Sequence, residues 1–323
     1  MARFDHLATT PRGPKDLFRW RVLDRMRMHQ PPREPTPEAL LAPAPLRPND
    51  GAALRAHGAS LTWVGHASFA LRLAGLTVLT DPIWSSRIQG VVRRLVPPGL
   101  RLDAVGPVDL VTVSHNHFDH LDLPTLKRIG PRARYVVPLG VGQTLREAGL
   151  PNVVELDWWQ SHREGDLEVT LVPARHWSMR MPWTRNDSLW GGFVLRAPEG
   201  SAYHSGDTGF FNDFKDIGER LGAIDHALLP IGAYEPRWFM EPQHMNPEDA
   251  RKAFELLGAR TFVAMHWGTF RLTDEPVGEP PSRIRALWEE AGDDPSRLWV
   301  LDVGETRPLG QARAHPRGEG LGG

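Results

Sequence analysis

The sequence predicts an α/β fold in which two mixed β-sheets lie between layers of helices. An early hairpin is the first indication, because Phe69, Leu71 and Leu73 alternate with small or polar residues and a second run at residues 77–80 follows Gly75. Later in the chain, strand-like runs are separated by helix-like runs, and no glycine-rich nucleotide fingerprint appears. A sandwich of two mixed sheets therefore fits better than one doubly wound sheet.

The remaining elements follow in order along the chain. The helix at 247–257 has the clearest start, since Asn246 can cap it, Pro247 suits its first turn, and Glu248 and Asp249 lie near the positive end of its dipole. The other expected helices cover residues 124–129, 141–148, 211–221 and 282–291. The expected strands cover residues 110–113, 135–137, 153–156, 169–172, 193–195, 227–230 and 261–265.

The two ends of the chain differ in composition from its centre. Residues 1–59 are rich in proline and arginine and are expected to form an arm with a short helix near 17–28, which Phe18, Trp20 and Met26 would help to pack. Residues 60–309 are expected to form the main domain, and residues 310–323 are polar, rich in glycine and expected to be a flexible tail.

Composition excludes several classes of function. The chain of 323 residues has 38 Lys and Arg against 39 Asp and Glu, so no net charge attracts nucleic acid. Cysteine is absent, which rules out disulfides and thiolate ligands and leaves histidine and carboxylate to hold any metal. The N-terminus has no apolar signal core and no run reaches about 20 apolar residues, so we expect a cytoplasmic protein that could contact a membrane peripherally.

The most informative stretch follows the apolar run at 108–113. Within it, His115, His117, Asp119 and His120 form the pattern His-x-His-x-Asp-His. The chain has 14 histidines, and three of them fall here in this order, so a polar loop rich in histidine by chance is a poor explanation. Imidazole and carboxylate are ligands that suit Zn²⁺, Fe or Mn²⁺.

Three further candidate ligands follow expected strands. These are His176, Asp207 in the sequence Gly-Asp-Thr-Gly, and His266. Each has a structural explanation when it is taken alone, such as a packed histidine or a turn. Together with the histidine-rich turn they make seven metal-ligating residues that rigid strands could aim at one place.

This pattern resembles that of the metallo-β-lactamase-fold hydrolases, and more narrowly that of the N-acyl-phosphatidylethanolamine-hydrolysing phospholipase D group. The narrower resemblance rests on the strings Glu155-Leu-Asp-Trp-Trp159 and Ile231-Gly-Ala-Tyr-Glu-Pro-Arg-Trp-Phe-Met240, and it extends over about residues 61–270. It implies the metallo-β-lactamase-type αβ/βα four-layer sandwich with two mixed β-sheets.

The resemblance also implies two divalent metal ions, Zn²⁺ first, with Fe or Mn²⁺ as alternatives. Asp207 would bridge them, a hydroxide between them would be the nucleophile, and Asp119 would orient that nucleophile or handle its proton. The first metal would be bound by His115, His117, His176 and Asp207. The second would be bound by Asp119, His120, Asp207 and His266.

Four other residues are expected near the site, and two of them, His244 and Arg237, have two interpretations each. His244 would bind phosphate or protonate a leaving group, or else it caps or packs a helix. His66 and Asp81 are expected to hold ligands in orientation. Arg237 is either a phosphate clamp or a buried ion-pair partner, and the second role is favoured.

The loop that follows His176 is rich in large apolar residues, Trp177, Met181 and Trp183 among them. An exposed apolar loop indicates a binding surface, so it is expected to be a rim that faces lipid or a contact in a homodimer. The family usually has Gln before this histidine, and Arg175 here places a charge next to the ligand.

The function that the resemblance implies is phospholipase D-type hydrolysis of N-acyl phosphatidylethanolamine-like glycerophospholipids. A lactonase or another small-ester hydrolase on the same fold is the alternative. A non-hydrolytic metal protein is a third alternative. A redox di-iron module is disfavoured because the 53 residues after Phe270 leave no room for a flavin-binding domain, and a structural relic is disfavoured because the ligand set is complete.

Overall fold

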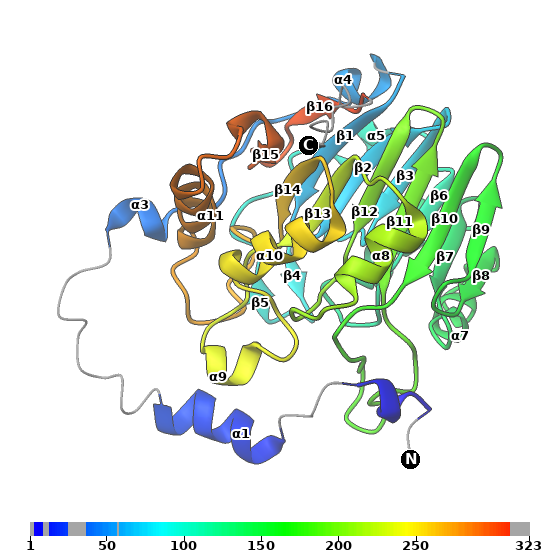
Figure 1. The fold of residues 1–323 in the computed structure, drawn as a ribbon. Helices are drawn as coiled ribbons and strands as arrows, with labels where there is room; N and C mark the ends of the chain where they lie inside the picture. Colours follow the sequence, from blue (N-terminus) through cyan, green and yellow to red (C-terminus); the bar gives the residue numbers. More distant parts are fainter. Residues whose placement is uncertain (1–2, 9–12, 25–36, 57, 311–323) are drawn as a thin grey trace, which may run out of the picture.

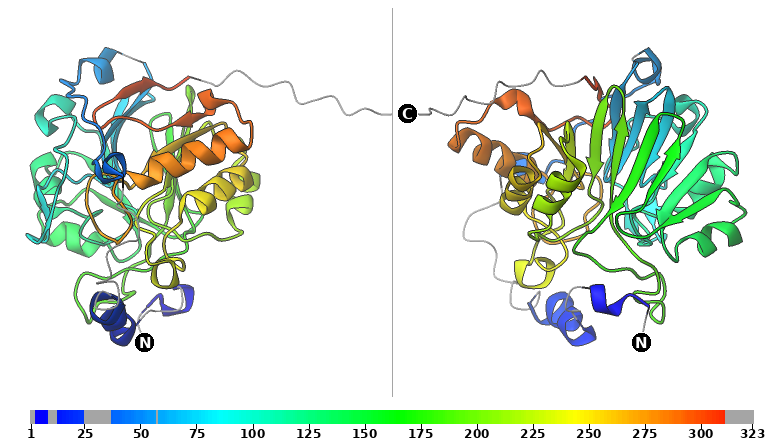
Figure 2. Two further views of the ribbon diagram at one scale, coloured as in Figure 1. Left: turned by 90° about the vertical axis from the view of Figure 1, so that its left-hand side faces the viewer. Right: turned by 45° about the vertical axis from the view of Figure 1, so that its right-hand side comes forward.

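The computed structural model describes residues 3–8, 13–24, 37–56 and 58–310. Within them two seven-stranded sheets face each other, and helices cover the outer face of each (Figure 1). This arrangement confirms the predicted fold class. Figure 2 shows the same layers from two further sides. No helix in the described ranges is long and apolar enough to cross a membrane.

The first sheet contains the early hairpin, and its strand order is β16-β1-β2-β3-β6-β7-β8. Distant parts of the chain meet at one edge of this sheet, where β16 pairs antiparallel with β1. The strands are β1 (Ser60–Gly65), β2 (Ser68–Leu73), β3 (Leu76–Thr80), β6 (Leu110–Thr112), β7 (Arg134–Pro138), β8 (Val153–Leu156) and β16 (Thr306–Pro308).

The second sheet contains the strands that alternate with helices, in the order β15-β14-β13-β12-β11-β10-β9. The strands β12 to β15 pair in parallel, and β9 to β12 pair antiparallel, so this sheet is mixed. The strands are β9 (Ser161–Glu164), β10 (Leu167–Val172), β11 (Gly192–Ala197), β12 (Gly200–His204), β13 (His226–Pro230), β14 (Thr261–Met265) and β15 (Leu298–Trp299). A separate small hairpin joins β4 (Arg87–Ile88) to β5 (Val92–Arg93).

Alternate residues of the first sheet enter two different cores. Leu71 lies in the core between the sheets, whereas Ala70 and Leu79 lie in the outer core with helix residues Leu54 and Leu126. Because both faces of the strands are covered, the strands read as nearly continuous apolar runs. The helices on this side are α4 (Ala52–Ala56), α5 (Leu102–Val105), α6 (Leu123–Ile129) and α7 (Gly142–Glu147).

Three longer helices cover the second sheet: α8 (Phe214–Leu221), α10 (Pro247–Leu257) and α11 (Glu279–Glu290). Helix α10 has the predicted bounds, and the side chain of Asn246 accepts a hydrogen bond from the amide of Asp249. Helix α8 begins three residues later than the sequence predicted. Helix α11 begins earlier, because Pro280 and Pro281 fit in a first helical turn.

The predicted N-terminal helix near 17–28 is helical over the residues that can be compared, and it begins three residues earlier, at Pro14. The structure has α1 (Pro14–Phe18) followed by a wider helical turn, η2 (Arg19–Asp24), whereas Met26 lies outside the described residues. Short helical turns also occur at η1 (Asp5–Leu7), α3 (Glu38–Leu41), α9 (Arg237–Met240) and η3 (Pro295–Arg297). Leu54, within the predicted arm, is fully buried in the outer core.

Candidate metal centre

Each candidate ligand lies just beyond the end of a strand, at one edge of the sandwich. The first sheet supplies His66 after β1 and residues 115–120 after β6. The second sheet supplies His176 after β10, Asp207 after β12 and His266 after β14. The two sheets therefore bring both sets of strand ends to one site.

The chain turns sharply at several of these strand ends. His66, Asp81 and His266 have φ of 57°, 39° and 61°, which residues other than glycine rarely adopt. Hydrogen bonds hold two of these turns, since the amide of His66 donates to the Thr269 hydroxyl at 2.8 Å and the amide of His266 donates to the His66 carbonyl at 3.1 Å. Such local strain is typical of functional sites.

Three imidazoles, His115, His117 and His176, form the first ligand group. Nδ1 of His117 lies 2.8 Å from Nε2 of His115 and 3.2 Å from Nε2 of His176. His176 carries its proton on Nδ1, because that atom donates to the carbonyl oxygen of Gln243 at 3.0 Å. The Nε2 lone pair of His176 therefore points towards His117, as a metal ligand requires.

Asp81 and Ser114 fix the imidazoles of His115 and His120. The carboxylate of Asp81 accepts from the amide and hydroxyl of Ser114, each at 2.6 Å, and from Nδ1 of His120 at 2.7 Å. Since the hydroxyl hydrogen of Ser114 goes to Asp81, its oxygen accepts from Nδ1 of His115 at 2.9 Å. Both imidazoles thus keep Nε2 free for a metal, which is the arrangement that an orienting role for Asp81 needs.

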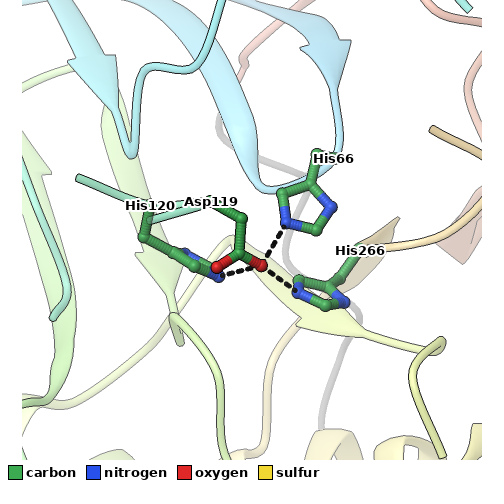
Figure 3. A group of neighbouring side chains, drawn as sticks. All are labelled: His66, Asp119, His120 and His266. Atoms are coloured by element: carbon green, nitrogen blue, oxygen red, sulfur yellow. Dashed lines mark hydrogen bonds and ion pairs between the residues drawn. The ribbon is translucent and has the colours of Figure 1, made fainter. Parts of the chain in front are cut away.

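Asp119 is the centre of the second ligand group, which includes His66, His120 and His266. Its Oδ2 lies 3.0 Å from Nε2 of His66, 3.6 Å from Nε2 of His120 and 3.8 Å from Nε2 of His266. Figure 3 shows this carboxylate pointing between the three rings. His66 was expected to be a supporting residue. Its Nε2 nevertheless lies closer to Oδ2 of Asp119 than the Nε2 atoms of the candidate ligands His120 and His266 do.

Asp207 lies between the two groups. Its Oδ2 is 3.1 Å from Nε2 of His120 and 4.0 Å from Nε2 of His115, and its Oδ1 is 3.1 Å from Nε2 of His266. One carboxylate therefore faces imidazoles of both groups, which is the position that a bridging ligand needs.

The donor atoms of this cluster fit divalent metal ions. Buried polar atoms in proteins nearly always have hydrogen-bond partners. Here several atoms of the cluster have none among the described residues: Nε2 of His120, Nδ1 of His244, Oδ1 of Asp207 and Nε2 of His266. Imidazole lone pairs and carboxylate oxygens, without thiolates, match the ligand preferences of Zn²⁺, Fe and Mn²⁺.

Burial favours the neutral imidazole that a metal ligand needs, except at His120, where the charges of Asp207, Asp119 and Asp81 outweigh burial and raise the pKa. Burial lowers the pKa of His117 to about 3 and that of His176 to about 4, so both imidazoles are neutral at physiological pH. Burial would raise the pKa of Asp119, but His120 and the hydrogen bond from His66 outweigh it and lower that pKa, so the carboxylate is ionised.

His244 and Arg237 belong to one small structural unit. The ring of His244 lies 5.3 Å from that of His176, and His244 shares a ligand group with His176 and Asp207. Arg237 donates to the carbonyl oxygen of His244 at 3.1 Å and to the carboxylate of Asp249 at 2.6 Å. The guanidinium of Arg237 therefore forms an ion pair, which is the role that the sequence favoured.

The ligands open into a cavity of about 440 Å³. His117, Asp119, Asp207 and His244 lie on its polar side. The apolar part of its wall includes Phe118, Trp177, Met179, Phe239, Met240 and Leu272.

The apolar loop after His176 divides into two parts. The ring of Trp177 packs edge-on against that of His117, with centroids 4.5 Å apart, and lines the cavity. Met181 and Trp183 are 45% and 75% exposed and are not among the lining residues. The Nη1 of Arg175 donates to the carbonyl oxygen of Phe210 at 2.8 Å, so the guanidinium of Arg175 binds a loop rather than lining the cavity.

Sequence analysis missed several residues that line this cavity, among them Arg180 and Trp20. Arg180 donates through Nη1 to the carbonyl oxygens of Asn116 and Leu121, at 3.0 and 2.9 Å, and so clamps the loop that carries the ligands. Trp20 comes from the N-terminal segment, and no sequence signal connects it to the site. The position of Arg180, four residues after a candidate ligand, was a signal for its role.

Comparison with known sequences gives a family match over residues 77–267, to the model described as the β-lactamase superfamily domain. The chain is 40% identical over 322 residues to an uncharacterized protein of Mycobacterium tuberculosis, covering 95% of this chain and 82% of that one. It is 36% identical over 267 residues to N-acyl-phosphatidylethanolamine-hydrolyzing phospholipase D 1 of Caenorhabditis elegans, covering 77% of this chain and 75% of that one.

Among solved structures, the chain is similar to Igni18, a metallo hydrolase from the archaeon Ignicoccus hospitalis. The TM-score is 0.61 with 26% identity, over 77% of this chain and 97% of that one. Fold, ligand cluster and family match agree with one another. The chain belongs to the metal-dependent hydrolases of the metallo-β-lactamase superfamily and is distantly related to the N-acyl-phosphatidylethanolamine-hydrolysing phospholipases D.

Proposed function

We propose that this protein hydrolyses a phosphodiester bond of a glycerophospholipid in the manner of a phospholipase D, with N-acyl phosphatidylethanolamines as the substrate class. The observation that carries the proposal is the junction of two ligand groups at Asp207, open to a cavity whose further walls are largely apolar. The likeness to the nematode phospholipase supports the same substrate class.

Two divalent metal ions, Zn²⁺ first, would occupy the two groups, with Asp207 shared between them. When bound, such ions act as Lewis acids towards a phosphoryl oxygen and lower the pKa of bound water. The first group would consist of His115, His117, His176 and Asp207. The second would consist of Asp119, His120, Asp207 and His266.

The chain's own side chains would then bind and orient the diester. Asp119 keeps its Oδ2 against His66, so the ionised carboxylate is held in one orientation at the cavity, where it can accept a proton. His244 lines the same cavity, and its unpartnered Nδ1 can hydrogen-bond to phosphate or to a leaving-group oxygen.

Arg180 supports an anionic substrate. Arg180 lines the cavity, its guanidinium lies 4.0 Å from the centroid of the Phe118 ring, and the negative charge of Asp122 acts on it. Burial lowers the pKa of Arg180 to about 10, so it is still a cation at neutral pH. A phosphodiester in the cavity would add a further anionic partner for this cation.

The exposed part of the apolar loop would meet the surface from which such a substrate comes. Trp183 is 75% exposed and Met181 45%, which is costly unless the loop has an apolar partner. We propose that these two side chains contact the membrane surface peripherally.

A hydrolysis screen tests the proposed function. Protein purified without chelator is assayed with an N-acyl phosphatidylethanolamine, a short-chain analogue with the same head group, a soluble phosphodiester and a lactone. We expect the acylated diester to be cleaved fastest. Asp207→Asn is the inactive variant that excludes a contaminating enzyme, and His162→Gln, outside the cavity, is the matched control. Cleavage of the lactone without any diester would replace the proposal by a lactonase.

A further inference from the structure

The N-terminal segment forms one side of the metal cavity, although it is nearly 100 residues away from the ligand motif in sequence. Trp20, in η2, is only 4% exposed and lines the cavity together with His117 and Asp207. Figures 1 and 2 show α1 and its continuation lying beside α9, below the lower end of the sandwich.

Three contacts fix the indole of Trp20. Its Nε1–H donates to the carboxylate of Asp274. Its ring packs against that of Phe239 with centroids 4.8 Å apart and planes inclined by 39°. The guanidinium of Arg21 lies over the indole at 4.0 Å from the ring centroid. The ring is therefore held in one position rather than resting loosely on the surface.

These contacts make a small core that is separate from the cores of the sandwich. Trp20 shares it with Ala233, Phe239 and Met240, all of which line the cavity. The cavity thus has the metal ligands on one side and a rigid apolar wall on another. A hydrocarbon chain attached to a metal-bound phosphate would find this wall within the same cavity.

We propose that Trp20 is a specificity-determining residue, and that η2 forms a wall that receives an acyl or alkyl chain of a phosphate ester. Asp274 is its positioning residue, because it anchors the indole. The proposal deepens the proposed function and rests on it for the phosphate that the chain accompanies.

The position of the wall in the sequence has a consequence for substrate range. Trp20 precedes the segment 77–267 that matches the family, and Asp274 follows it. The two residues that the proposal names for chain preference therefore lie outside the family domain, whereas Ala233, Phe239 and Met240 of the same wall lie within it.

A binding measurement tests the wall without requiring turnover. Calorimetry on the Zn²⁺-loaded protein compares monododecyl phosphate, below its micelle concentration, with methyl phosphate. We expect the long ester to bind more tightly, and Trp20→Ala to reduce this advantage about tenfold, as would follow from loss of contact with roughly two methylene groups. Asp274→Ala should act in the same direction, whereas Asp274→Asn keeps an oxygen acceptor for the indole and should restore most of the advantage.

Phe18→Ala is the matched control, because Phe18 belongs to the same segment but is 55% exposed and is not among the lining residues. It should leave the ratio of the two affinities unchanged. An unchanged ratio in Trp20→Ala, with zinc content intact, overturns the proposal. A protein that cleaves no diester, but loses the chain advantage with Trp20→Ala, supports the wall and contradicts the proposed function.

Discussion

The metal centre and the wall of the cavity are built in different ways. The candidate ligands lie at the ends of strands from both sheets, next to the fully buried core. The apolar wall comes from η2, α9 and the loop after His176, which are short segments at the surface. Rigid strands hold chemical groups accurately, whereas surface segments can change without disturbing the core. On the proposed function, the chemistry and the choice of substrate would therefore have separate structural supports.

Removal of the shared carboxylate should have the largest effect. We predict that Asp207→Ala abolishes hydrolysis and lowers metal content in both groups, because Asp207 faces imidazoles of each. His266→Ala should deplete mainly the second group. Elemental analysis and activity are measured on the same samples. A fully loaded wild-type protein with one metal ion per chain would contradict the bridging role.

His226 is a buried histidine remote from the metal centre, and it can show whether burial alone lowers the pKa of a histidine. His226, at the start of β13, has its pKa lowered to about 4 by burial, against the opposing charge of Asp225. The unfolded chain binds this proton below about pH 6.5 and the folded chain does not, so stability falls as pH drops from 6.5 towards 4. The loss should be about 3 kcal/mol of unfolding free energy.

Urea unfolding of metal-free protein at pH 7 and pH 4 measures this loss. His226→Gln has no such proton to bind, so its stability should change by about 3 kcal/mol less between the two pH values. Equal losses in the two proteins would mean that His226 does not carry the effect.

The residues that orient the ligands should matter less than the ligands themselves. Asp81→Ala removes the acceptor for Nδ1 of His120 and for Ser114. We expect a loss of about 10- to 100-fold in metal affinity or activity, as is usual for such partners of ligating histidines. Asp103→Asn is the control, because the side chain of Asp103 in α5 is exposed. A variant as inactive as Asp207→Ala would place Asp81 among the ligands.

The exposed rim should have the smallest effect, and one restricted to the substrate. Replacing Met181 and Trp183 with Ser should slow turnover of a long-chain diester in vesicles several-fold and spare a soluble diester. The two side chains are outside the cavity lining, so the chemistry does not depend on them. Equal losses with both substrates would make the loop structural and would weaken the distinction between centre and wall.

The sequence by itself determined the candidate ligand set and the hydrolase family of this protein, because that information is local. Four candidate ligands lie within His115 to His120, and β14 and α10 have the predicted bounds because their apolar patterns and caps are encoded within a few residues. The order of strands and helices was likewise enough to predict two mixed sheets.

Tertiary structure alone decided which distant residues meet. His66 reaches Asp119, Asp81 binds both Ser114 and His120, and β16 closes the sheet against β1. Trp20 becomes part of the cavity through Asp274, 254 positions later in the chain. Such contacts depend on packing between surfaces, which no short pattern encodes, because the free energy that selects them comes from burial in the whole fold.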